Sequence, residues 1–442
     1  MTAAGGKPRK RLPLHARILI GLVIGAVAGL FVNLAFRDAP WVASVAKNVA
    51  DPVGRIFLNL VTMAVIPLIF SALALGVAGL RDVGTLGRVG LRALGYTVIV
   101  TTASVVIGVT AANVFRPGDL VDEEGKAALR EKMAIPESLE KAAVESPSAI
   151  DSIVEIIPRN PVEAASKALD GQMLALMFFS LVIGIALLRV PREKGAPLVG
   201  FLEALFEVST RVVGFGLFIA PVGVAALLFS LTAKLGADIL GSLGAYVLVV
   251  LGGLALQQFG VYPLLLKFVS GVSPLDFFRK IRVVMLTAFS TASSNVTLPV
   301  ALKAAEEDVG IPRQVSSFVL TVGSTANQNG TALFEGVTVL FLAQLLGVDL
   351  SIGQQLVVVL LSVIAGIGTA GVPAGSIPAI MLVLESVGIP GAAIGVILGI
   401  NHPLDMCRTV LNVTGDITAA VYVAKAEKMP LVPTASAGSA RD

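Results

Sequence analysis

The last apolar segment of the chain carries its polar side chains on one face. With about 100° of rotation per helical residue, Asp405, Arg408, Thr409, Asn412 and Asp416 fall within a stripe about 100° wide. Arg408 can bind a carboxylate through two parallel hydrogen bonds, and Asp405 can accept hydrogen bonds from an ammonium group. Asn412 and Thr409 can complete such a shell, so the face predicts a site for an acidic amino acid. A purely structural ion pair between Asp405 and Arg408 is the alternative interpretation.

Other groups on this face and in the preceding segment are suited to cations. Asp416, with Asn412 and backbone carbonyls, offers the oxygen ligands that a small monovalent cation requires. The stretch 323–331, GSTANQNGT, is rich in Gly, Asn and Gln, which predicts a break with freed carbonyls, or alternatively a kinked packing interface. Glu335 follows with no basic neighbour in its segment. Burial would disfavour its charge, so it could carry a proton; a neutral hydrogen-bonded core residue is the alternative.

The elements that hold these residues must lie in a membrane. Only 14% of the 442 residues are charged and the mean hydropathy is +0.87, whereas a soluble domain carries roughly 25% charged residues. A net charge of +3, one cysteine (Cys407) and two histidines disfavour a nucleic-acid binder, a disulfide scaffold and a His/Cys metal site. We therefore expect a lipid bilayer around the chain, and neither a cofactor nor a nucleic-acid partner.

Apolar runs of about 20 residues predict an all-α polytopic membrane protein with eight transmembrane helices. The expected crossings are 16–36, 53–80, 89–115, 169–190, 197–231, 240–269, 314–346 and 391–424. Two more apolar segments, 283–302 and 353–382, are interrupted by the small-residue clusters 290–295 and 366–373. Non-helical backbone at membrane depth must be buried in protein or line a cavity, so we expect two re-entrant helical hairpins and an inverted repeat with a midplane site.

The charges between the segments predict the orientation. Basic clusters precede the first crossing and follow the second, fourth and sixth, so these ends should be cytoplasmic. Residues 117–168 hold 11 acidic and 6 basic residues and five prolines, which predicts a partly irregular extracellular loop. We expect a multi-pass protein of the cell membrane with both termini in the cytoplasm.

Four stretches together resemble the dicarboxylate/amino acid:cation symporters, the family of the archaeal aspartate transporters and the eukaryotic excitatory amino acid transporters. They are Ser290 to Pro299 (STASSNVTLP), Asn327 to Glu335 (NQNGTALFE), Gly368 to Pro373 (GTAGVP) and Leu404 to Asp416 (LDMCRTVLNVTGD). The resemblance implies an elevator-type homotrimer. It also implies scaffold helices mainly in 14–270, with the loop 117–168 among them, and a transport domain of 271–425 joined by the third and sixth spans. The tails 1–13 and 426–442 would be cytoplasmic.

The resemblance also assigns the site residues. It places the substrate side-chain carboxylate on Arg408 and its amino group on Asp405, and the remaining shell comprises Thr409, Asn412, Thr331, Ser294 and Val372. Residues resembling one sodium site are Gly323, Asn327, Asn412 and Asp416. Those resembling a second are Thr325, Gly366, Ile367 and Thr369.

The chain departs from the family pattern at a third sodium site. Asn329 stands where sodium-coupled members have Asp, and Val100 stands where they have Thr, although Thr101 remains. Glu335 occupies the position that resembles the proton-carrying glutamate of the eukaryotic members. The family has an additional arginine, in the first hairpin of the archaeal members and two residues before the substrate-binding arginine of the eukaryotic members. This chain has Ala292 and Met406 at those two positions. We expect proton-coupled symport of glutamate or aspartate with reduced or absent sodium dependence; the alternatives are sodium-coupled symport and C4-dicarboxylate symport.

Other functional classes fit the sequence less well. An anion channel or a receptor could use the same polar helix, but two hairpins flanking one site suit alternating access better. An enzyme would need a nucleophile beside a base, and Ser293 and Ser294 have no evident activating base. His15 and His402 lie at segment ends rather than at the polar face. We therefore expect a transporter and not an enzyme.

Overall fold

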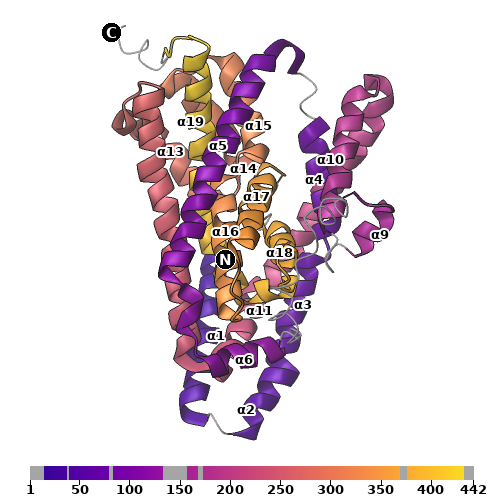
Figure 1. The fold of residues 1–442 in the computed structure, drawn as a ribbon, viewed down its shortest axis with the longest axis vertical. Coiled ribbons are helices and arrows are strands. Elements are labelled where there is room, and N and C mark those ends of the chain that lie inside the picture. Colours follow the sequence, from indigo (N-terminus) through magenta and orange to yellow (C-terminus); the bar gives the residue numbers. More distant parts are fainter. Residues whose placement is uncertain are drawn as a thin grey trace, which may run out of the picture.

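The computed structural model describes residues 14–36, 39–78, 83–132, 157–167, 173–368 and 376–432. Within these residues every regular element is a helix, and the long ones run roughly along the longest axis of the molecule (Figure 1). The first half comprises α1 (Leu14–Phe36), α2 (Pro40–Val45), α3 (Asp51–Thr62), α4 (Val65–Ala78), α5 (Val83–Phe115), α6 (Glu123–Lys132), α9 (Pro161–Ser166), α10 (Met173–Arg189) and α11 (Arg192–Leu256). The second comprises α12 (Tyr262–Leu264), α13 (Pro274–Thr291), α14 (Ser294–Lys303), α15 (Arg313–Ala326), α16 (Asn329–Leu345), α17 (Ile352–Gly368), α18 (Ile377–Ser386) and α19 (Leu398–Ala426).

Fewer helices than expected have the length and composition of a simple membrane span. Among the described residues these are Ala16–Phe36, Arg88–Leu120 and Gly236–Val269, and a fourth is the pair Arg192–Gly216 and Phe218–Lys234, bent by 50°. Several expected crossings are divided instead. The second is interrupted between α3 and α4, and the seventh between α15 and α16. The number of eight crossings therefore remains a prediction, because helix length and composition identify only continuous spans and not those divided between two helices.

The two interrupted segments form pairs of packed helices. α13 packs on α14, and the turn between them has Ala292 at a positive φ of 47° and Ser293 at the N-cap of α14, whose Oγ accepts from the Val296 N–H at 3.3 Å. This pair begins earlier than expected, at Pro274. α17 packs on α18, and the connection 369–375, with Thr369 and Val372, lies outside the described residues. Re-entry of either pair from one side of a membrane remains a prediction.

α11 consists of two parts that meet at Gly236. The backbone there has φ 66° and ψ −141°, a conformation that L-residues with a side chain avoid. Before this residue, α11 packs closely on α1, with the backbone of Ala225 against Gly25. After it, the hydroxyls of Tyr246 and of Thr338 in α16 form a hydrogen bond of 2.7 Å. The fifth and sixth expected spans therefore contact different parts of the molecule.

α16 is the most enclosed element of the chain. All of its residues, Asn329 to Leu345, are buried, and it packs against α5, α11, α17 and α19. Near its middle, Tyr246 of α11 stacks on Phe341 with ring centroids 4.4 Å apart. Its first turn contacts Asn412 on the polar face of α19, and its last turn contacts the segment that follows α5.

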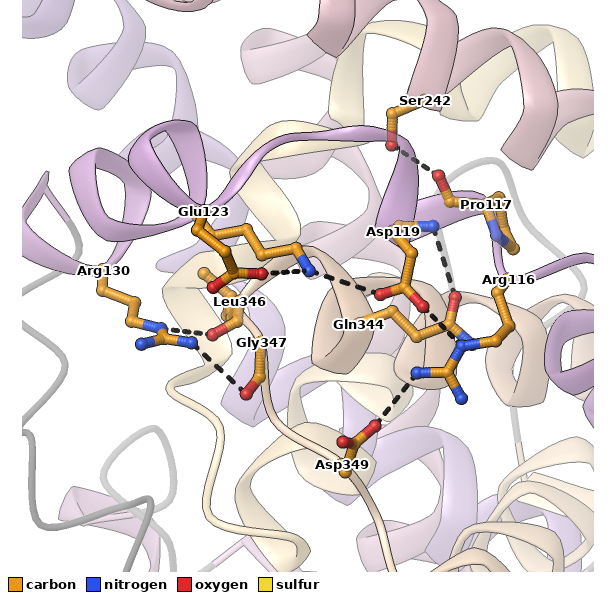
Figure 2. Close-up of polar contacts among 12 residues, drawn as sticks. Arg116, Pro117, Asp119, Glu123, Arg130, Ser242, Gln344, Leu346, Gly347 and Asp349 are labelled. Atoms are coloured by element: carbon orange, nitrogen blue, oxygen red, sulfur yellow. Dashed lines mark hydrogen bonds and ion pairs between the residues drawn. The ribbon is translucent and has the colours of Figure 1, made fainter.

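The segment 116–130, which we call the clasp, covers the C-terminal end of α16 (Figure 2). The Arg130 Nε donates to Leu346 O at 2.5 Å and its Nη2 donates to Gly347 O at 3.3 Å. Ion pairs join Arg116 to Asp119 and, at 3.0 Å, to Asp349. The Ser242 hydroxyl donates to Pro117 O at 2.8 Å. The loop expected to be irregular thus begins as an ordered, docked segment that includes α6, while residues 133–156 lie outside the described residues.

Candidate substrate and coupling site

The centre of the site is the guanidinium of Arg408, which is completely buried on α19. Its Nη2 pairs with Asp405 Oδ1 at 2.8 Å and donates to Asn401 Oδ1 at 3.1 Å, while Nη1 donates to Ser376 Oγ at 3.0 Å. The ion pair considered as the structural alternative is therefore present. The buried Nε has no hydrogen-bond acceptor among the described residues, so this cation retains a donor for an anionic ligand.

An aromatic ring supports the same guanidinium. The Arg408 Cζ lies 3.8 Å from the ring centroid of Phe334, which is fully buried on α16. A cation held over an aromatic face is stabilised by the ring quadrupole, more so where water is excluded. Phe334, Ser376 and Asn401 were missed in the sequence. Asn401 could have been found, because seven residues before Arg408 falls on the same helical face, whereas Ser376 and Phe334 carry no local signal.

Asn412 connects the polar face of α19 to the start of α16. Its Oδ1 accepts from the Gly330 N–H at 2.7 Å, and its Nδ2 donates to Gln328 Oε1 at 2.5 Å and to Thr331 Oγ1 at 3.1 Å. An uncapped helix N-terminus leaves N–H groups unsatisfied, and Asn412 satisfies one of them. The structure thus brings Asn412 and Thr331 together as expected.

The remaining substrate residues of the sequence prediction are less directly connected. The Thr409 hydroxyl donates to Asp405 O at 2.8 Å on its own helix. Ser294 is buried in the first turn of α14, and α14 packs against α19. The position of Val372 lies outside the described residues.

Three residues of the first set of cation candidates lie together where α15, the helix break and α19 meet, while the fourth, Asn412, uses its Oδ1 to accept from Gly330. Asp416 Oδ1 accepts from Asn327 Nδ2 at 2.9 Å. A Cβ added to Gly323 would lie 2.5 Å from that same oxygen, so only glycine allows this approach. The buried Oδ1 of Asn327 has no hydrogen-bond donor among the described residues. A carboxylate and a free amide oxygen are suitable ligands for a hard monovalent cation, so these residues fit one.

The second set is only partly assembled. Gly366 O accepts from the Gln328 N–H at 3.2 Å, and the Thr325 hydroxyl donates to Val322 O at 3.1 Å within its own helix. Ile367 is half-buried beside Gly366, and Thr369 lies outside the described residues. Two of the expected oxygens are therefore engaged in protein hydrogen bonds.

The region of the expected third sodium site holds a neutral hydrogen-bond network. Asn329 Oδ1 accepts from Thr101 Oγ1 at 2.5 Å, and Asn329 Nδ2 donates to the Tyr262 hydroxyl at 2.9 Å. That hydroxyl donates to Leu411 O at 3.1 Å. Because an asparagine side chain can both donate and accept, the Asn329 amide forms hydrogen bonds with both neighbouring hydroxyls, and neither bond requires a bound cation. The buried Val100 contributes only a backbone carbonyl, which accepts from Gln257 at 3.5 Å.

Three buried polar residues at and just before the start of α12 were missed in the sequence. Gln257, Gln258 and Tyr262 are buried, and Gln258 Nε2 donates to Thr414 Oγ1 of α19 at 3.0 Å. Two consecutive glutamines within an otherwise apolar span are the signal that could have identified them, since a buried amide requires a partner.

Glu335 is completely buried on α16, next to Phe334. Neither carboxylate oxygen has a hydrogen-bond partner among the described residues. The alternative of a hydrogen-bonded core residue is therefore not favoured. An isolated carboxylate anion in such surroundings is very costly, whereas the protonated form is tolerated far better. The neighbouring residue, Phe334, carries the Arg408 guanidinium on its ring, so Glu335 lies one residue from the aromatic contact of the buried arginine.

A buried arginine and carboxylate on the polar face of α19, beside the helix broken between α15 and α16, suit the binding of a small charged solute. The chain belongs to the sodium:dicarboxylate symporter family, whose model matches residues 14–426. It is therefore a transporter of the multi-pass membrane class and not an enzyme.

Similar proteins cover almost the whole chain. It is 33% identical to the proton/glutamate-aspartate symporter of Escherichia coli (strain K12), over 94% of this chain and 93% of that protein. It is 34% identical to the proton/sodium-glutamate symport protein of Bacillus caldotenax, over 95% of each. It is 30% identical to excitatory amino acid transporter 3 of Bos taurus, over 96% of this chain and 88% of that protein.

Proposed function

We propose that the chain is a secondary active symporter of glutamate and aspartate, driven by protons through Glu335 with reduced or absent sodium dependence. The observation that carries this proposal is the Arg408–Asp405 pair at 2.8 Å, whose guanidinium lies over the ring of Phe334, the residue before the completely buried Glu335. The names of the similar proteins, which are proton or proton/sodium symporters of acidic amino acids, support it.

The ion pair supplies both halves of the recognition chemistry. An acidic amino acid brings a side-chain carboxylate for Arg408 and an ammonium group for Asp405, so each charge of the pair exchanges its partner for one on the substrate. Neither charge is left unpaired at any stage, which matters because breaking a buried pair on one side is strongly destabilising. Asn412, Thr331 and Thr409 would contact the α-carboxylate and the ammonium group, with Ser294 and Val372 completing the shell.

Charge balance explains why a proton would accompany the substrate. Glutamate and aspartate carry one net negative charge at neutral pH, whereas the Arg408–Asp405 pair is neutral. Adding the substrate (−1) together with one proton on an ionised Glu335 (+1) leaves the net charge of the buried groups unchanged, which avoids the cost of adding a net charge to a region of low dielectric constant.

Sodium-coupled symport is the second candidate because of one observation. Gly323, Asn327 and Asp416 surround oxygen atoms that fit a monovalent cation, and the Asn327 Oδ1 has no donor among the described residues. C4-dicarboxylate symport is less favoured, since a substrate without an ammonium group would leave Asp405 unpaired.

The architecture proposed to serve this function is that of an elevator. The transport unit comprises residues 271–425 with the third and sixth spans, and it moves against scaffold helices of 14–270 within a homotrimer. Eight crossings and two re-entrant hairpins would place both termini in the cytoplasm. The contrasting contacts of α11 before and after Gly236 support a division at this point.

Uptake of labelled aspartate and glutamate into proteoliposomes tests the proposal. With an inside-alkaline pH gradient and no sodium, we expect accumulation above the external concentration, and added sodium should change the rate by no more than about twofold. Glu335→Gln should abolish accumulation driven by the pH gradient but retain exchange of internal for external substrate, since a permanently neutral residue cannot release a proton. Glu307→Gln, at a half-exposed position, is the control.

Two outcomes would contradict the proposal. Accumulation that requires sodium would replace proton coupling with sodium coupling. Unchanged accumulation by Glu335→Gln would remove Glu335 as the proton carrier.

A further inference from the structure

Gln328 lies in the break between α15 and α16 and makes hydrogen bonds to three elements. It is 2% exposed. Its side-chain Nε2 donates to Ser324 O of α15 at 2.9 Å, its Oε1 accepts from Asn412 Nδ2 of α19 at 2.5 Å, and its backbone N–H donates to Gly366 O of α17 at 3.2 Å.

The side chain takes the place of its own backbone. In a continuous helix, the N–H of Gln328 would donate to the carbonyl of Ser324, four residues earlier. Here the side-chain amide makes that hydrogen bond, and the backbone N–H is released to bind α17. The carbonyl that a helix break would otherwise leave unsatisfied is therefore paired within the protein, without a cation.

The other end of the same amide fixes Asn412. Because Asn412 Oδ1 must accept from the Gly330 N–H, its Nδ2 has to point toward acceptors, and Gln328 Oε1 and Thr331 Oγ1 are those acceptors. Loss of the Gln328 oxygen would leave one of the two Nδ2 protons without its partner and would free the Asn412 side chain to rotate.

We propose that Gln328 is a positioning residue for substrate binding. It holds Asn412 in its binding orientation and ties it to α17 through neutral hydrogen bonds, so that high affinity does not depend on a cation at the helix break. This inference rests on the proposed function, in which Asn412 contacts the substrate.

The chain offers a matched control in Gln344, near the other end of α16. Gln344 is also buried, at 6% exposed, and its side chain also makes two hydrogen bonds, donating to Ala112 O at 3.0 Å and accepting from the Gly118 N–H at 3.2 Å. Gln→Met at either position removes an amide of similar size and two hydrogen bonds, but only Gln328 faces Asn412.

The test compares Gln328→Met with Gln344→Met in proteoliposomes and in detergent. We expect Gln328→Met to raise the KM for labelled aspartate by about tenfold with a maximal rate within about twofold of the wild type, because a lost hydrogen bond at the site weakens binding. Gln344→Met should leave KM within about twofold, and both variants should lower the melting temperature by similar amounts.

Equal KM values for the two variants would overturn the role of Gln328, provided that the wild type accumulates substrate. Absence of wild-type uptake would instead contradict the proposed function, so the two failures are distinguishable. Should a Met variant not be recovered from membranes, Gln328→Glu and Gln344→Glu repeat the comparison, with a larger KM expected for Gln328→Glu and equal values overturning the proposal.

Discussion

The two ends of α16 satisfy their free backbone groups by different chemistry. At the N-terminal end a neutral amide does so, because the Asn412 Oδ1 accepts from the Gly330 N–H. At the C-terminal end, the Arg130 guanidinium binds the last carbonyls, as Figure 2 shows. Both choices agree with the helix dipole, which favours acceptors at the N-terminus and cations at the C-terminus.

The charged groups at the two ends also differ in their access to water. The Arg116–Asp349 pair of the clasp has side chains 47% and 89% exposed, whereas Arg408 at the site is completely buried. Exposed ion pairs contribute at most about 1 kcal/mol, while removing one member of a buried pair costs about 3–5 kcal/mol. Equivalent changes at the two ends should therefore differ greatly in effect.

The largest contrast is expected from the arginines. Arg408→Lys should lower aspartate uptake at subsaturating concentration by about a hundredfold or more, because an ammonium group cannot bind a carboxylate through two parallel hydrogen bonds. Arg116→Lys in the clasp should stay within about twofold of the wild type. Initial rates of labelled uptake at equal protein content measure both, and an Arg408→Lys variant retaining a third of wild-type uptake would contradict the comparison.

An intermediate effect is expected at Phe334. Phe334→Leu removes the aromatic face beneath Arg408, which is worth about 1–2 kcal/mol when desolvated, so KM should rise roughly fivefold to thirtyfold. Phe341→Leu is the control, because Phe341 is equally buried on the same helix but stacks on Tyr246 instead. Its KM should stay near that of the wild type while its melting temperature falls. Similar KM values for the two variants would show that the ring is structural.

The smallest effect is expected at the outer end. Arg130→Gln weakens the cap on Leu346 and Gly347, an interaction worth about 0.3–1 kcal/mol, so the melting temperature of this long chain should fall by about 1 °C or less. Uptake should remain within about twofold of the wild type. Thermal unfolding in detergent and transport in liposomes measure the two quantities. A tenfold loss of uptake would mean that the clasp acts on transport and not only on stability.

The polar face of α19 was predictable because it is a local property of one helix. Asp405, Arg408 and Asn412 follow from helical rotation alone, and the break near Asn327 follows from the Asn, Gln and Gly content. Ser376 was not predictable, because it reaches Arg408 from 32 positions away in the chain. The role proposed for Gln328 also depends on its backbone N–H, which donates to a carbonyl of α17 instead of one in its own helix. No pattern of residue types predicts such a hydrogen bond.

The clasp was missed in the sequence for a related reason. An acidic, proline-containing loop is typical of irregular structure, but the docking of Arg130 depends on carbonyls at the end of a helix more than two hundred residues away. The sequence contains the charges, whereas their partners are backbone atoms, which are the same for every residue type.

Gly236 bears on how this chain can change by mutation. Its φ of 66° and ψ of −141° leave no strain-free alternative residue, and an added Cβ would lie 2.9 Å from the Asn33 amide oxygen. Any substitution there would straighten or break the junction between the part of α11 on α1 and the part on α16. A library of single substitutions selected for uptake should therefore retain glycine at this position, although it lies far along the chain from the residues proposed to contact substrate.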